Sequence, residues 1–151
     1  MGRQYLADAA ATEAFGARMA ACCRTGGLIF FHGELGAGKT TLVRGLLRAL
    51  DHTGPVKSPT YALVESYQLA SGELHHLDLY RLADPGELEW IGIRDLLGGD
   101  ALVLIEWPGH GKGVLPEPDL ELTMHYREAG REIEFRAVSG IGHKWLSCLE
   151  S

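Results

Sequence analysis

The fold is decided by one stretch, Gly33-Glu34-Leu35-Gly36-Ala37-Gly38-Lys39-Thr40, which matches the pattern G-x-x-x-x-G-K-[ST] at every fixed position. An apolar run precedes it at residues 28–31, and residues 39–50 carry leucines and a valine on one helical stripe. The stretch therefore lies between a predicted strand and a predicted helix. In such a loop, glycines let successive backbone N–H groups face a phosphate, and the first turn of the helix adds partial positive charge. We predict a phosphate-binding loop (P-loop) in which Lys39 contacts the β- and γ-phosphates and the Thr40 hydroxyl ligates Mg²⁺.

Composition and charge limit the class of protein. The chain has 151 residues, of which 46% are hydrophobic and 23% charged, as is usual for one soluble globular domain, so we predict a single domain over residues 1–151. A net charge of −6 argues against a surface whose main role is to bind nucleic acid. Charged residues interrupt the N-terminal region, and the longest apolar runs, such as residues 101–105, are too short to cross a membrane. We therefore expect a cytoplasmic protein with no membrane partner.

The cysteines point to the same compartment. There are three, Cys22, Cys23 and Cys148, so the count is odd, and no CxxC motif is present. We predict neither a disulfide framework nor a zinc site, and a reducing cytosol is the simpler interpretation. Cys22 and Cys23 are expected to act as small apolar residues near the end of a helix.

The pattern of apolar residues and turn residues predicts the other elements. We expect a helix over residues 9–24, strands over 61–69 and 74–79 joined by a hairpin turn, a helix that starts at Asp84 and breaks near Gly92, a strand over 101–107, a second hairpin with strands over 120–126 and 132–138, and a short helix in the last ten residues. A purely parallel sheet would need more crossover helices than this chain supplies. The predicted fold is α/β: a P-loop NTPase-like domain whose mixed β-sheet contains hairpins and is flanked by helices.

Two acidic residues are candidates for binding Mg²⁺. Glu106 ends an apolar strand, which is the usual position of the metal-binding carboxylate in P-loop enzymes, although that residue is more often Asp. Asp78 is the second candidate, in the segment HHLDLYR at residues 75–81. One of the two would hold the metal and the other would orient the attacking water, and the sequence leaves that assignment open. The adjacent residues His75 and His76 would point to opposite faces of a strand, which argues against both binding one ion.

The identity of the nucleotide follows from a missing residue type. Guanine-specific GTPases of the Ras type use an N-K-x-D motif, and this sequence contains no asparagine. ATP is therefore the expected nucleotide, and Mg²⁺ is its expected metal.

Four motifs together resemble the TsaE (YjeE) family. They are, in order, GELGAGKTT at residues 33–41, SPTY at 58–61, HLDLYR at 76–81 and IEWP at 105–108. TsaE is the bacterial ATPase needed for threonylcarbamoyladenosine modification of tRNA, at an adenosine next to the anticodon. The resemblance covers nearly the whole chain and implies a P-loop fold, slow ATP hydrolysis, and docking on a TsaB–TsaD complex that hydrolysis resets between turnovers. It also implies that the protein acts on tRNA only indirectly, through TsaB–TsaD, which agrees with the negative net charge.

The P-loop pattern and the resemblance assign roles to individual positions. Lys39, Glu106 and Asp78 would be catalytic, and Thr40, Glu106 and Asp78 would lie at the metal. Nucleotide contacts would come from Gly33, Leu35, Gly36, Ala37, Gly38, Lys39, Thr40, Thr41, Thr60, Trp107, Ala9 and Gly130. The last two mark longer stretches without a distinctive motif, residues 9–12 and 130–131. After Trp107, many family members have an acidic or polar pair beyond the proline, whereas this chain has Gly109-His110, so contacts from those two positions are not carried over.

Two other functions stay open at this point. A small-molecule kinase could use the same P-loop, but such kinases usually have an arginine-rich lid, and most arginines of this chain are scattered. A non-hydrolysing binding module would use ATP only to order a surface for a partner. Transfer of phosphate to a metabolite would support the first, and an ATPase assay that stays flat even with partners would support the second.

Overall fold

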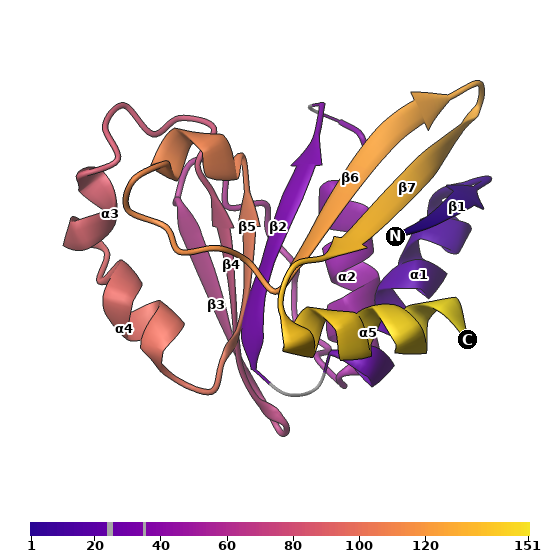
Figure 1. Ribbon diagram of the computed structural model, residues 1–151, viewed down its shortest axis with the longest axis horizontal. Helices are drawn as coiled ribbons and strands as arrows, with labels where there is room; N and C mark the ends of the chain where they lie inside the picture. Colours follow the sequence, from indigo (N-terminus) through magenta and orange to yellow (C-terminus); the bar gives the residue numbers. More distant parts are fainter. Residues whose placement is uncertain (24–25, 35) are drawn as a thin grey trace.

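A seven-stranded mixed sheet lies at the centre of the molecule, in a computed structural model that describes residues 1–23, 26–34 and 36–151 (Figure 1). The strand order is β1-β7-β6-β2-β5-β4-β3. The strands are β1 (Gly2–Leu6), β2 (Gly27–Gly33), β3 (Val64–Leu69), β4 (Gly72–Asp78), β5 (Leu102–Glu106), β6 (Leu120–Arg127) and β7 (Gly130–Ala137). β4, β5, β2 and β6 pair in parallel, whereas β3, β7 and β1 are antiparallel to the strands beside them. The prediction of a mixed α/β sheet with two hairpins is confirmed.

The parallel centre of the sheet is buried on both faces. All five residues of β5 are buried. In β2, Ile29 and Phe31 belong to one hydrophobic core, and Leu28 and Phe30 belong to another on the opposite side. Alternate side chains of a strand point to opposite faces, so a strand covered on both sides reads as a continuous apolar run. This explains the apolar segment that precedes the P-loop.

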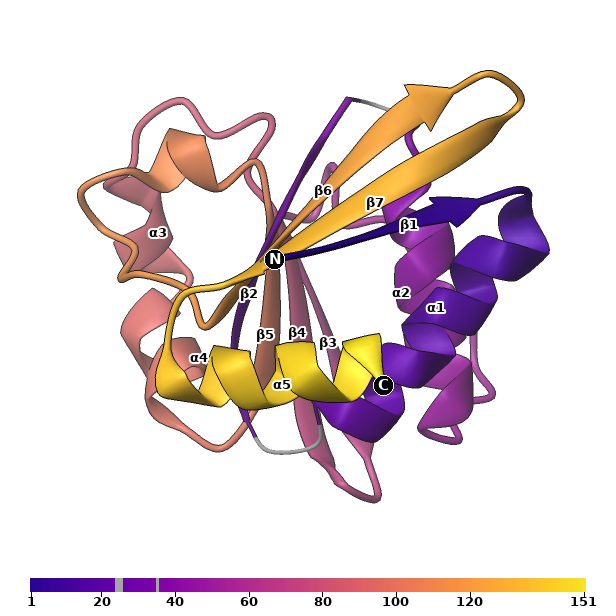
Figure 2. The same cartoon turned by 45° about the vertical axis from the view of Figure 1, so that its right-hand side comes forward.

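Helices cover both faces of the sheet (Figures 1 and 2). One side carries α1 (Ala9–Cys22), α2 (Lys39–Ala49) and α5 (Gly140–Glu150), and the other carries α3 (Glu87–Trp90), α4 (Ile93–Gly98) and the 3₁₀ helix η1 (Pro108–Gly111). Within the described ranges, no helix has the length and apolar character that a membrane crossing requires.

Two glycines allow α1 to pack closely on α2. A Cβ atom built on Gly16 would lie 2.1 Å from the carbonyl oxygen of Leu42, and one built on Gly45 would lie 2.1 Å from that of Glu13. Any larger residue would push the helices apart. The close approach brings the N-terminal end of α1 beside α2, the helix that follows the P-loop.

The predicted elements form with small shifts at their ends. The strand expected from residue 61 begins at Val64, because Leu63 has a left-handed backbone, with φ 73°, that ends the preceding turn. The helix expected from Asp84 begins at Glu87, and the Asp84 side chain accepts a hydrogen bond in the turn before it. The break near Gly92 is confirmed, because this residue separates α3 from α4.

The edge strand β1 was not predicted from the sequence. It pairs with β7, and Leu6 lies opposite Arg131. Its partner lies more than a hundred residues away in the chain, so only the folded sheet shows that residues 2–6 form a strand. This pairing places the start of the chain close to the turn between β6 and β7.

The cysteines correct one prediction. Cys22 at the end of α1 and Cys148 in α5 form a disulfide across a sequence separation of 126 residues. The prediction that the chain forms no disulfide, with Cys22 only an apolar side chain near a helix end, is wrong, because distant segments of the chain meet where α1 and α5 pack. The cysteines therefore no longer support the inference of a reducing compartment. Arg18 adds a second link by donating a hydrogen bond to the backbone carbonyl of Leu149. Cys23 is a buried thiol, and burial raises its pKa to about 12.

Candidate nucleotide-binding site

The P-loop connects the end of β2 to the start of α2. Gly33, Gly36 and Gly38 have φ values of 145°, 77° and 108°, a backbone region that side-chain-bearing residues rarely adopt. Gly38 directly precedes α2, so the first N–H groups of that helix have no intrahelical partner and are available to an anion. The predicted contact from Leu35 lies outside the described residues. The loop has the local geometry that phosphate binding requires.

Lys39 contacts the acid that ends the neighbouring strand. β2 and β5 are adjacent and parallel, with Phe31 opposite Glu106. Lys39 Nζ donates a hydrogen bond of 2.8 Å to the carbonyl oxygen of Gly33 and lies 3.5 Å from Glu106 Oε1. Nζ also lies 4.9 Å from the centre of the Trp107 ring. The side chains of Lys39 and Glu106 are each only 5% exposed, so their charges interact in a poorly solvated environment.

Asp78 reaches the same place from the next strand. β4 pairs with β5 in parallel, and Asp78 lies opposite Glu106. Asp78 Oδ2 accepts a hydrogen bond of 3.1 Å from Thr60 Oγ1, and Asp78 Oδ1 accepts one of 3.0 Å from the backbone N–H of Tyr80. Thr60 Oγ1 is in turn 2.8 Å from Ser58 Oγ. Hydrogen bonds therefore join Asp78, at the end of β4, to the Ser-Pro-Thr segment. The sequence alone did not show that these two motifs are in contact.

These residues line one cavity of about 240 Å³. Its walls consist of Gly36, Gly38, Lys39, Thr40, Thr41, Ser58, Thr60, Asp78 and Glu106. The structure thus brings together Thr40 and both acids predicted to lie at the metal. Carboxylate and hydroxyl oxygens are the ligand type that Mg²⁺ prefers, and Mg²⁺ usually takes only one or two protein carboxylates. The residues present fit that ion.

A second cavity of about 190 Å³ shares Gly36, Gly38 and Thr41 with the first. Its other walls come from Leu6, Asp8, Ala9, Thr12, Ala37, Ala129, Gly130 and Arg131. Ala9 and Gly130, which the resemblance implied as nucleotide contacts, do lie beside the P-loop, because β1 pairs with β7. Arg131 Nε donates a hydrogen bond of 3.1 Å to the carbonyl oxygen of Ala37, which ties the late hairpin to the loop. Sequence reasoning missed Leu6 and Asp8, since strand β1 was itself missed.

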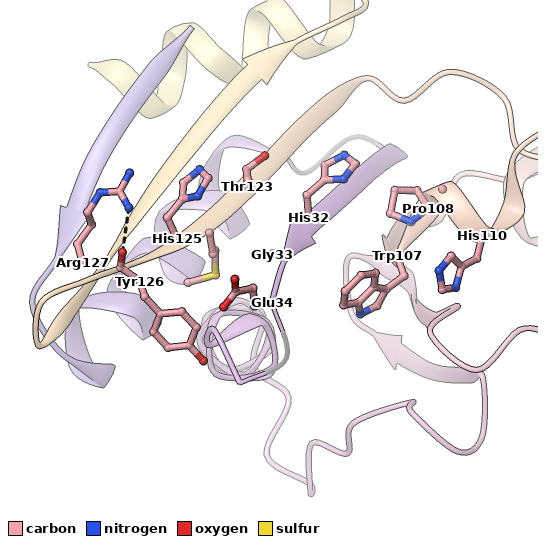
Figure 3. A pocket seen from close by; sticks show the side chains of 12 residues that line it. His32, Gly33, Glu34, Trp107, Pro108, His110, Thr123, His125, Tyr126 and Arg127 are labelled. Atoms are coloured by element: carbon pink, nitrogen blue, oxygen red, sulfur yellow. Dashed lines mark hydrogen bonds between the residues drawn. The ribbon is translucent and has the colours of Figure 1, made fainter.

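A third and larger cleft, of about 620 Å³, borders the P-loop at Gly33 and Glu34 (Figure 3). It is lined by His32, Gly33, Glu34, Trp107, Pro108, Gly109, His110, Thr123, Met124, His125, Tyr126 and Arg127. Trp107 lines this cleft rather than the two smaller cavities, and Figure 3 shows it across Glu34 from Tyr126. Burial lowers the pKa of His32 below its ordinary value, and Lys39 and Arg136 act in the same direction against the opposing charge of Glu121.

Trp107 stacks its ring on that of His110 and contacts Tyr80 at a tilted angle. Its φ is 55°, in the left-handed region, and its ring lies 5.1 Å from that of Tyr80 and 5.8 Å from that of His110. His110 Nδ1 is 2.8 Å from the carbonyl oxygen of Leu79. His110 therefore supports the tryptophan through its imidazole ring.

His76 contacts Glu106, a role that the sequence did not indicate. His76 is fully buried, and its Nε2 lies 2.5 Å from Glu106 Oε2. His75 lies on the opposite face of β4, as expected for the next residue of a strand, and its Nδ1 is 2.7 Å from Ser66 Oγ. The described residues contain no group of three or more His, Cys, Asp or Glu side chains placed to hold a metal. His75 and His76 therefore have different partners, Ser66 and Glu106, on opposite faces of β4.

Comparison with known proteins agrees with the fold and the motifs. A family model described as "Threonylcarbamoyl adenosine biosynthesis protein TsaE" matches residues 6–133. The tRNA threonylcarbamoyladenosine biosynthesis protein TsaE of Haemophilus influenzae is 48% identical over 124 residues, which cover 82% of this chain and 78% of that protein. The TsaE protein of Bacillus subtilis is 35% identical over 130 residues, covering 84% of this chain and 80% of the relative. The crystal structure of Bacillus subtilis YdiB superposes with a TM-score of 0.82 at 26% identity, over 99% of this chain and 93% of that one. The chain belongs to the TsaE family.

Proposed function

We propose that the protein hydrolyses ATP and thereby sustains the threonylcarbamoyladenosine modification of tRNA by a TsaB–TsaD complex. The observation that carries the proposal is the cavity in which the P-loop lysine faces two strand-end acids, Glu106 and Asp78. The relatives from Haemophilus influenzae and Bacillus subtilis are biosynthesis proteins for this modification, which supports the process in which the site would work.

The triphosphate would lie along the P-loop. Backbone N–H groups from Gly36 to Thr41 would contact the phosphates, and Thr40, Glu106 and Asp78 are the residues that would hold Mg²⁺. Bound Mg²⁺ would neutralise charge on the β- and γ-phosphates. Lys39 would exchange its present contacts with the Gly33 carbonyl and Glu106 for the phosphate oxygens, because they carry more negative charge.

The acceptor of the phosphoryl group would be water, which gives ADP and inorganic phosphate. An acid must orient that water, and both Asp78 and Glu106 line the cavity where it would attack. Thr60 holds the Asp78 carboxylate from one side through its hydroxyl. The proposal leaves open which of the two acids performs this role and which holds the metal.

The nucleoside would occupy the smaller cavity beside the P-loop. Ala9 and Thr12 at the start of α1 and Gly130 at the late hairpin border it, and Gly36 and Thr41 connect it to the phosphate cavity. A ligand that spans both cavities has a nucleoside at one end and phosphates at the other, which is the shape of ATP. The chain carries no asparagine for a Ras-type guanine motif.

The partner would be a protein complex rather than tRNA itself. A net charge of −6 does not favour direct binding to a phosphate backbone. We propose that TsaB–TsaD in the cytoplasm is the partner and that it raises a weak basal hydrolysis rate. The larger cleft, which borders the P-loop at Gly33 and Glu34, lies where a docked partner could sense or change the bound phosphates.

A reconstituted modification assay tests this function. Purified TsaB–TsaD, its other substrates and tRNA are combined with the wild-type protein, Lys39→Ala or Glu106→Ala, and modified tRNA is counted per TsaD molecule. We expect many turnovers with the wild type and about one with either variant. Sustained modification by both variants would contradict the proposal. Phosphate transfer to a metabolite would instead indicate a kinase, and full support without any ADP formation would indicate a binding module.

A further inference from the structure

We propose that His76 is a positioning residue that holds the Glu106 carboxylate in the orientation used for Mg²⁺-nucleotide binding. The inference rests on the proposed function, since Glu106 is there one of the residues at the metal. It adds a role for a buried histidine that does not reach the cavity wall itself.

The sheet register places His76 behind the acid. His76 lies opposite Leu104, and Glu106 is two residues further along β5, so both side chains point to the same face of the sheet. This diagonal relation between neighbouring strands is within reach of a long side chain. His76 Nε2 lies 2.5 Å from Glu106 Oε2, and a carboxylate can only accept, so the imidazole N–H donates.

The two oxygens of Glu106 have different partners. Oε1 lies 3.5 Å from Lys39 Nζ, whereas Oε2 bonds to His76. If Lys39 turns toward a triphosphate, the first contact is lost and the second stays. His76 would then be the group that keeps the carboxylate from rotating while Oε1 faces the metal. Groups that orient a metal-binding side chain in this way commonly affect metal affinity as strongly as some ligands do.

The rest of the His76 ring makes no competing polar contact in the described part of the chain. Its Nδ1 is buried without a hydrogen-bond partner there. A buried polar atom without a partner carries a cost, so a residue retained only for packing would be better served by an apolar side chain. The hydrogen bond to Glu106 gives the imidazole a function that an apolar residue would lack.

The neighbouring histidine offers a matched control. His75 is also buried, on the same strand, but it lies on the opposite face and contacts Ser66 and Glu73. Replacing it removes an imidazole from the same strand without touching Glu106. Any effect seen for both histidines would therefore come from the strand rather than from the carboxylate.

The experiment measures how Mg²⁺ changes the affinity for a non-hydrolysable ATP analogue, by calorimetry with and without the metal. Four proteins are compared: the wild type, His76→Leu, His76→Gln and His75→Leu. His76→Leu should weaken the Mg²⁺-dependent gain in affinity by about 10-fold or more, the range for a lost orienting contact, while affinity without Mg²⁺ stays within about 2-fold. His76→Gln, whose amide can place an N–H near the former Nε2, should retain most of the gain, and His75→Leu should match the wild type.

Three results would overturn the inference. They are an unchanged Mg²⁺ response in His76→Leu, equal losses in His76→Leu and His75→Leu, or equal losses in His76→Gln and His76→Leu. If His76→Leu does not fold in a thermal melt, His76→Met fills the site more flexibly. A Glu106→Gln background adds a second check, because there the removal of His76 should leave the remaining Mg²⁺ response unchanged.

Failure of the proposed function would look different. A wild-type protein that binds the Mg²⁺-nucleotide but never releases phosphate, even with TsaB–TsaD, would contradict ATP hydrolysis. The comparison of His76 variants would still decide the positioning role, because its readout is binding.

Discussion

Lys39 Nζ lies 3.5 Å from Glu106 Oε1, and both side chains are 5% exposed. The P-loop cation and the strand-end acid therefore neutralise each other in a poorly solvated position. A buried charge without a partner is strongly unfavourable. Nucleotide phosphates would replace the carboxylate as the partner of the lysine, so the stability of this protein should be coupled to ligand binding.

Glu106→Gln tests that coupling. The substitution preserves the shape of the side chain but removes the negative charge that lies 3.5 Å from the buried Lys39 Nζ. We expect the free energy of unfolding without nucleotide to fall by about 3 kcal/mol, the lower end for a broken buried pair. ATP without Mg²⁺ should recover part of that loss, because its phosphates supply an opposite charge for Lys39, and chemical denaturation with and without ATP measures the recovery. Glu117→Gln, at an exposed residue, is the control, and a loss of equal size with and without ATP would contradict the coupling.

Thr60→Val tests the link between the Ser-Pro-Thr segment and Asp78. Valine has nearly the shape of threonine but cannot donate the hydrogen bond that Asp78 Oδ2 accepts at 3.1 Å. The steady-state ATPase rate should fall about 10-fold, as for other lost orienting contacts, whereas Thr60→Ser should keep most of the activity. Equal rates for the valine and serine variants would show that this hydroxyl does not orient the acid.

Cys148→Ser tests the disulfide. The bond to Cys22 closes a loop with a sequence separation of 126 residues. Its removal should lower the free energy of unfolding by about 2–4 kcal/mol in non-reducing buffer, and a strong reductant should bring the wild type to the same value. Intact mass under denaturing conditions should show one free thiol in the wild type, that of Cys23. Three alkylated cysteines in protein purified without reductant would contradict the disulfide.

His32 makes part of the stability depend on pH. Burial holds its pKa below the ordinary value of about 6.5, so the unfolded chain binds a proton more readily than the folded protein between those two values. Stability contributed by neutral His32 is therefore complete above about pH 6.5 and is lost as the pH falls toward the lowered folded pKa. His32→Gln should reduce this loss in unfolding experiments between about pH 7 and 5. An NMR titration that places the His32 pKa above 6.5 would contradict the direction of the shift.

Local sequence patterns predicted the parts of the site that depend on neighbouring residues. The glycines around Lys39 and the apolar run before Glu106 are readable because a P-loop and a buried parallel strand each place strict demands on a short segment. Their meeting follows from the adjacency of β2 and β5, which the usual arrangement of P-loop domains anticipates. For that reason the acid expected at the metal does lie beside the lysine.

Contacts between residues far apart in the chain could not be predicted from local sequence patterns. The hydrogen bond from His76 to Glu106 follows from a diagonal register between two strands, and the disulfide of Cys22 follows from the packing of two helices far apart in sequence. Strand β1 had too few residues to carry a distinct pattern, although it places Ala9 beside the smaller cavity next to the P-loop. In each case the sequence shows the residue type, but the contact partner is set by the folded structure.

If the P-loop site hydrolyses ATP under the control of TsaB–TsaD, the rate of phosphate release must depend on Lys39 and on that complex. Inorganic phosphate and ADP are measured during incubation with Mg²⁺-ATP, with and without TsaB–TsaD, for the wild type and Lys39→Ala. We predict equal amounts of phosphate and ADP, a low wild-type rate that the partner complex raises, and no release above background by Lys39→Ala. A wild-type rate that stays at the level of Lys39→Ala in the presence of TsaB–TsaD would contradict ATP hydrolysis at this site.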